Sequence, residues 1–179
     1  VQFKIAAASK REIEQCSRDS AMILELVCDM DLDEKKQPML LLEDSESPGL
    51  EQRVPIESLF TGTEKHNLVV VVGKDAHLAL QPLKQKAIQN VLTINTTCYS
   101  TDRMASEFLG RFYRMVMLGF LVNEAFNQAL KDVTTPTESN KLNEICCCLH
   151  EHNPQCKWLQ LVERFGLETV RFGFNSVRQ

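Results

Sequence analysis

The sequence predicts an α/β domain built on a mostly parallel sheet flanked by helices. Residues 67–72 end in four consecutive valines, which is typical of a strand buried on both faces in the middle of a parallel sheet. A second strand is expected over residues 91–96. A short helix candidate, residues 82–89, lies between them, so the segment predicts a βαβ unit with a right-handed crossover.

The composition narrows the class of protein. The chain has 179 residues, of which 44% are hydrophobic and 25% charged, which is enough for one domain with its own core. A net charge of −4 without a concentrated Lys/Arg stripe argues against binding to nucleic acid. No apolar run approaches the roughly 18 residues that a membrane helix needs. The N-terminus has no signal-peptide pattern, so we expect a cytoplasmic protein whose seven cysteines are reduced.

The first part of the chain is expected to begin with a strand over residues 1–8. Ser9 and Glu12 have the spacing of a capping box, which predicts the start of a helix. Apolar residues at helical spacing predict a further helix over residues 23–30. The carboxylates near its end lack the spacing and the glycine of a calcium loop, and they predict a solvated turn: Asp29, Asp31, Asp33 and Glu34.

The segments on either side of the βαβ unit have their own patterns. Residues 38–42 are expected to form a strand, residues 43–53 a surface loop, and residues 55–60 a single helical turn. After the unit, apolar residues at steps of three and four predict a long helix over residues 102–118. Gly119 interrupts this pattern, and a second helix is expected to follow it.

These elements divide the chain into three parts. Residues 1–133 are expected to form the α/β domain, and residues 134–139 a linker that contains Pro136. Residues 140–179 are expected to form a small, Cys/His-rich helical appendage. Near its end, residues 170–174 are apolar enough to dock as a strand.

Cys98 and His77 are the candidate catalytic residues. Each follows one of the two predicted parallel strands, whose carboxyl ends lie side by side in such a sheet. A thiol becomes a useful nucleophile when a general base lies within hydrogen-bond reach. The alternative is that Cys98 is a small buried apolar residue and His77 a solvated loop residue. His66 lies at the opposite end of its strand and is not a candidate.

Three segments in order resemble the CHAT domains, which are relatives of the caspases. Residues 95–100 (Asn-Thr-Thr-Cys-Tyr-Ser) resemble the nucleophile segment of that family. Residues 105–114, with a Phe-Tyr pair, resemble the helix that follows it. Residues 118–119 (Leu-Gly) and 124–129 (Glu-Ala-Phe-Asn-Gln-Ala) resemble the closing part of the domain. The resemblance covers roughly residues 66–132.

The resemblance implies a caspase-like fold and a cysteine peptidase with a Cys/His dyad. In that case Cys98 attacks a peptide carbonyl, His77 acts as the base, and backbone amides near Cys98 or Gly73 hold the oxyanion. The chain departs from the family pattern at two points. The family places a His directly before the Gly that ends the preceding strand, where this chain has Val72. The family also has a further strand before the Phe-Tyr helix, whereas here Ser100 runs almost directly into that helix.

The C-terminal part holds enough thiols and imidazoles to bind zinc, which prefers four such ligands. A helix would place Cys148 and His152 on one face, four residues apart. The alternative is a partly buried helix end with incidental cysteines. The candidate metal ligands are Cys146, Cys148, His150, His152 and Cys156.

These patterns predict a degenerate caspase-like (CHAT-like) domain, a pseudoenzyme that acts as a protein-interaction module with a protein or peptide as its partner. Two alternatives remain open at this point. The first is an active cysteine endopeptidase that uses Cys98 with His77. The second is a zinc-binding structural domain centred on the C-terminal Cys/His cluster, with zinc as the candidate cofactor.

Overall fold

The structure is a computed structural model, and it describes only part of the chain. The described residues are 2–18, 23–60, 66–86, 88, 90–96, 99–133, 147–151 and 168–173. Of these, residues 2–5, 18, 99–102, 147–151 and 168–173 are described by their backbone. Among the described residues, no helix combines the length and the apolar character needed to cross a membrane.

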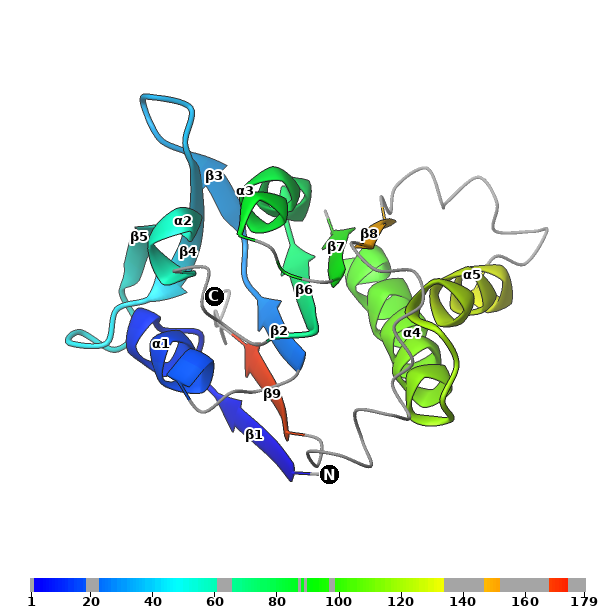
Figure 1. The fold of residues 1–179 in the computed structure, drawn as a ribbon. Coiled ribbons are helices and arrows are strands. Elements are labelled where there is room, and N and C mark those ends of the chain that lie inside the picture. The colour runs from blue at the N-terminus through cyan, green and yellow to red at the C-terminus, as the bar shows by residue number, and fades with distance from the viewer. Residues whose placement is uncertain are drawn as a thin grey trace.

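A six-stranded sheet organises the described part of the chain (Figure 1). Neighbouring strands are parallel, except that the last pair is antiparallel. The prediction of a mostly parallel sheet flanked by helices is therefore confirmed. In spatial order the strands are β1 (Gln2–Ala6), β9 (Glu168–Gly173), β2 (Ile23–Val27), β6 (Leu68–Gly73), β7 (Asn90–Asn95) and β8 (Cys147–Glu151).

A second, antiparallel sheet is inserted between β2 and β6. It contains β3 (Met30–Leu32), β4 (Pro38–Glu43) and β5 (Glu51–Pro55). The predicted strand at residues 38–42 is confirmed, but the end of the predicted loop at residues 43–53 belongs to β5. The loop prediction failed there because exposed residues of an edge strand resemble a loop in composition.

The acidic segment forms turns and a surface ion pair. Asp33 Oδ1 accepts hydrogen bonds from the backbone N–H groups of Lys35 at 2.8 Å and Gln37 at 2.7 Å. Asp31 Oδ2 lies 3.0 Å from Arg53 Nη2 across the small sheet. Among these acidic residues, Asp29 has a different role at the end of β2, which is described below.

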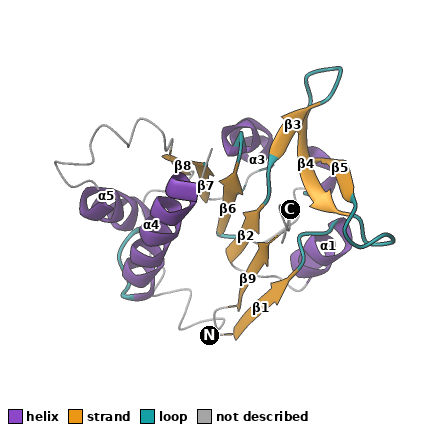
Figure 2. Ribbon diagram, turned by 180° about the vertical axis from the view of Figure 1, so that it is seen from behind, coloured by secondary structure: helices purple, strands orange, loops and turns teal. Residues whose placement is uncertain are grey.

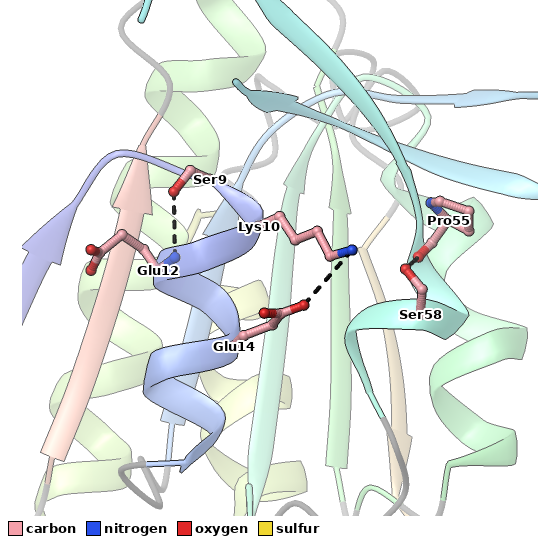
Figure 3. A network of polar contacts seen from close by, with 6 residues as sticks. All are labelled: Ser9, Lys10, Glu12, Glu14, Pro55 and Ser58. Atoms are coloured by element: carbon pink, nitrogen blue, oxygen red, sulfur yellow. Dashed lines mark hydrogen bonds and ion pairs between the residues drawn. The ribbon is translucent and has the colours of Figure 1, made fainter. Parts of the chain in front are cut away.

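The helices begin and end close to where the sequence predicted. Ser9 caps α1, with its Oγ accepting the N–H of Glu12 at 3.4 Å (Figure 3). Figure 3 also shows the Lys10–Glu14 ion pair of α1, at 3.9 Å, and the hydrogen bond that the Ser58 hydroxyl donates to the Pro55 carbonyl, at 2.8 Å. The helices are α1 (Lys10–Arg18), α2 (Ile56–Leu59), the 3₁₀ turn η1 (Ala76–Ala79), α3 (Leu80–Gln85), α4 (Tyr99–Met117) and α5 (Val122–Val133).

The large sheet separates two hydrophobic cores, because successive strand residues point to opposite faces. Val69 and Val71 of β6 belong to one core, together with residues of α1, α2, α3 and the small sheet. Val70 and Val72 belong to the other core, which α4 and α5 cover. Figures 1 and 2 show these two groups of helices on opposite sides of the sheet. All six residues of β6 are buried, as expected for a central strand.

The predicted helix over residues 23–30 is wrong, because residues 23–27 form the buried strand β2. Both faces of this strand lie in the core, so apolar residues occur on both faces, and their spacing also fits a helix. The Cys28 N–H then extends the pairing with β6 by donating to the Val72 carbonyl at 3.0 Å.

Glu25 places a carboxylate in the middle of β2, on the face that α4 covers. Glu25 is only 2% exposed to solvent. The Tyr113 hydroxyl of α4 donates a hydrogen bond to Glu25 Oε2 at 2.8 Å, across 88 positions of sequence. Because a buried carboxylate needs such donors, this bond fixes the position of α4 on the sheet.

The C-terminal segments differ from the predicted helical appendage. Residues 147–151 form β8 at one edge of the large sheet, and residues 168–173 form β9 between β1 and β2. The expected docking strand at residues 170–174 thus corresponds to β9. β-branched and aromatic residues favour strands, and both segments pair with strands of the large sheet: β8 with β7, and β9 with β1 and β2. The predicted linker, residues 134–139, lies outside the described residues.

Replacing Tyr113 with Phe tests the contact between α4 and β2. We expect Tyr113→Phe to lower the free energy of unfolding by about 1–3 kcal/mol, since the buried Glu25 carboxylate loses a donor. Urea denaturation measures this change. Ser45→Ala, in an exposed loop, is the control and should stay within about 0.5 kcal/mol of the wild type. Equal stability of the two variants would show that the hydroxyl does not hold α4.

Candidate functional site

The carboxyl ends of β6 and β7 form the candidate site. Gly73 pairs with Asn95, and the N–H of Thr96 donates to the Gly73 carbonyl at 3.0 Å. After β6 the chain enters η1 and α3, which belong to one core, whereas after β7 it enters α4, which belongs to the other. Open α/β sheets bind their ligands outside the carboxyl ends of the strands, which is where this site lies.

The turn after β6 is anchored by the segment that joins β2 to β3. The Lys74 N–H donates to Asp29 Oδ1 at 2.9 Å, and the Lys74 carbonyl accepts the N–H of Met30 at 2.9 Å. Asp75 then adopts a left-handed conformation with φ 57°, which directs the chain into η1. These backbone contacts determine where η1 begins.

His77 lies in η1 with an exposed side chain. Its Nδ1 is 3.4 Å from Oδ1 of Asn95, the last residue of β7. The structure therefore brings the predicted base to the carboxyl end of the strand that precedes Cys98 in the sequence.

Cys98 itself lies outside the described residues, so its pairing with His77 stays a prediction. The nearest described residues are Thr96 and Tyr99. Thr96 is buried at the end of β7, and α4 begins at Tyr99. Ser100 is already part of α4, so the strand that the CHAT family has at this point is absent between Ser100 and Met117.

Gly73 has a structural reason to be glycine. A Cβ at this position would overlap the carbonyl oxygen of Cys28, so only glycine allows β6 to approach the end of β2 so closely. Gly73 also belongs to the β6–β7 ladder through its pairing with Asn95. Its proposed role in holding an oxyanion stays a prediction, and Val72, where the family has its base, is buried in the second core.

The two cysteines whose side chains are described are not candidates for the nucleophile. Cys16 and Cys28 are free and buried. Burial raises the pKa of the Cys28 thiol from 9.0 to about 12, and the negative charge of Asp29 adds to the shift. Cys28 therefore remains a neutral thiol at physiological pH, behaving as a small apolar residue.

The proposed zinc ligands are only partly covered by the structure. Cys148 and His150 lie two residues apart in β8, whereas Cys146, His152 and Cys156 lie outside the described residues. Because Cys148 is in a strand, the expected helical pair of Cys148 and His152 is wrong. Among the described residues there is no group of three His, Cys, Asp or Glu side chains placed to hold a metal ion.

Two residues of the site were not identified from the sequence. Asn95 appeared there only as part of a resemblance, and Asp29 as one member of an acidic turn. The position of Asn95 at the end of a buried strand was the available signal. No pattern in the sequence could show that Asp29 binds the backbone of Lys74, because 45 positions separate them.

A second surface feature lies at the turn between α4 and α5. Gly119 adopts φ 90°, which lets the chain reverse direction there. The neighbouring side chains of Met117, Leu118 and Phe120 are 43%, 66% and 41% exposed. We call these three residues the apolar turn. Clustered exposed apolar side chains are typical of protein contact sites.

No protein-family model and no curated protein matches this chain. The function must therefore be inferred from the chain's own residues and geometry.

Replacing Gly73 with Ala tests the close approach of β6 and β2. We expect Gly73→Ala to lower the free energy of unfolding by about 3 kcal/mol, the upper end of the usual cost of overpacking, because the new Cβ meets backbone atoms. The matched control is Gly110→Ala in α4, where a Cβ meets nothing within 4 Å. It should raise stability by about 0.5–1 kcal/mol. Similar urea midpoints for the two variants would contradict the close approach.

The raised pKa of Cys28 predicts a loss of stability in alkali. Between pH 9 and 10 the unfolded chain loses this thiol proton while the folded chain keeps it, so the free energy of unfolding falls with rising pH, by about 1 kcal/mol. Cys28→Ala should lack this component while keeping the contribution of all other groups. Urea unfolding of both proteins at the two pH values measures the difference. Parallel pH profiles would mean that Cys28 is accessible to solvent.

Proposed function

We propose that this chain is a divergent caspase-like domain of the CHAT type that acts as a protein-interaction module. The observation that carries the proposal is the position and burial of Val72. This residue occupies the position where the family has its base, and its side chain is in the core beneath α4 and α5. A buried valine cannot transfer a proton, which supports a domain of this type without the family's base.

The arrangement of the sheet supports the choice of scaffold. Parallel strands β6 and β7 are neighbours, and helices cover both faces of the sheet. The aromatic residues of the resembling segments pack together. Phe108 stacks on Phe112 with ring centroids 6.0 Å apart and meets Phe126 of α5 edge to face at 5.6 Å.

The apolar turn supports an interaction role. Its three side chains are exposed although neighbouring residues of α4 and α5 are buried in the second core. Burial of such side chains against a protein partner is favourable by about 25 cal/mol per Å² of apolar surface. A partner with an apolar surface of its own would bind there.

An active cysteine endopeptidase is the second candidate, and one observation favours it. His77 is beside Asn95, at the carboxyl end of β7, three residues before Cys98 in the sequence. His77 could replace the missing base from a position four residues after Gly73. The two candidates differ in the state of the Cys98 thiol.

The pH dependence of Cys98 alkylation separates the two candidates. Native protein is treated with iodoacetamide across the pH range, and the modified peptide is quantified by mass spectrometry. An interaction module predicts an ordinary thiol, with a pKa of about 8.5 and a rate unaffected by His77→Ala. A reactive thiolate well below pH 7 that is lost in His77→Ala would establish the peptidase instead.

Matched surface variants test the interaction role. Affinity purification is compared for the wild type, Leu118→Glu, Cys98→Ala and Leu50→Glu. Leu50 is the control because it is 61% exposed, close to the 66% of Leu118, but lies before β5. We expect Leu118→Glu to lose the proteins that the other three retain. Retention by Leu118→Glu, or loss in Cys98→Ala, would contradict binding through the apolar turn.

A further inference from the structure

We propose that Asn95 is a positioning residue for His77, which fixes the tautomer and the orientation of its imidazole. The basis is the 3.4 Å contact between His77 Nδ1 and Asn95 Oδ1. With the Asn95 amide oxygen facing the ring, as it is placed here, the hydrogen bond forms in the tautomer that carries a proton on Nδ1. In the neutral ring the lone pair is then on Nε2.

Both partners of this hydrogen bond are held by backbone structure. Asn95 ends β7, where it pairs with Gly73 and is followed by the hydrogen bond from the Thr96 N–H to the Gly73 carbonyl. His77 is held by η1, in which the Leu78 N–H donates to the Asp75 carbonyl at 3.0 Å. The amide and the imidazole are therefore brought together by two elements that the sheet already fixes.

The tautomer has a chemical consequence. A general base accepts a proton through a nitrogen that carries a lone pair, and the hydrogen bond made by one ring nitrogen sets which nitrogen that is. With Nδ1–H donating to Asn95, Nε2 is the basic atom of His77. The use of Nε2 as a general base requires that the peptidase candidate is correct. The hydrogen bond between His77 and Asn95 does not depend on that candidate.

The state of the His77 ring can be read directly by NMR of protein labelled with ¹⁵N-histidine. At about pH 8, where an ordinary imidazole is neutral, we expect the Nδ1–H tautomer for His77 in the wild type. In Asn95→Ala the ring should change to Nε2–H. In Asn95→Asp the carboxylate should raise the pKa of His77 by about one unit, because a nearby negative charge stabilises the imidazolium.

Controls separate this contact from general charge effects. Lys74, Asp75, Asp29 and Lys84 also carry charge near η1, but they are the same in every variant. Gln52→Glu on β5 adds the same charge away from His77 and should leave its pKa unchanged. Asn95→Asp keeps the shape of the side chain, so it remains informative where Asn95→Ala does not fold.

Two results would overturn the proposal. One is the Nε2–H tautomer for His77 in the wild type, and the other is an equal pKa of His77 in Asn95→Asp and Gln52→Glu. The alkylation profile of Cys98 tests the peptidase candidate separately. An ordinary Cys98 thiol together with an Nδ1–H tautomer of His77 would reject that candidate and retain Asn95 as the residue that orients the ring.

Discussion

The structure depends on the burial of β6. Both edges of this strand are paired, with β2 on one side and β7 on the other, and both of its faces lie in hydrophobic cores. Four consecutive valines meet this requirement, because β-branched side chains fit a pleated surface that is covered on both sides. The end of β6 is equally constrained, since Gly73 must be glycine to pass the carbonyl of Cys28. Because both faces of β6 must be buried, helices are needed on both faces of the sheet.

The same constraint places the polar residues of the candidate site. Since β6 and β7 are paired to their last residues, the turn that carries His77 meets the end of β7, and the amide of Asn95 meets the imidazole. The charged contacts there, such as the one between Asp29 and the Lys74 N–H, bind the backbone and leave η1 in a fixed place. The site therefore derives its geometry from strand pairing, whereas its chemistry depends on which side chains the chain has kept. Val72 has no group that could transfer a proton, and its side chain is in the second core.

The elements predicted correctly are those whose residue pattern fits only one type of secondary structure. The four valines of β6, the helix start at Ser9 and the long helix α4 were predicted correctly because their periodicity or chemistry is specific. Residues 23–27 were not predicted as a strand. A strand buried on both faces lacks the alternation of apolar and polar residues that distinguishes a strand from a short helix. The contact of Asn95 with His77 could be anticipated only as far as Asn95 lies near the end of one predicted parallel strand and His77 follows the other. The contacts of Asp29 and Tyr113 join residues far apart in sequence, so they required the fold.

The central claim is that the caspase-like scaffold remains while peptide cleavage has been lost. The most direct measurement is the cleavage of a complex peptide mixture, with new termini identified by mass spectrometry after incubation with the wild type or with Cys98→Ala. The account predicts the same set of termini for both proteins, because a valine, Val72, is at the position where the CHAT resemblance places the base. Termini that appear with the wild type and are absent with both Cys98→Ala and His77→Ala would contradict it.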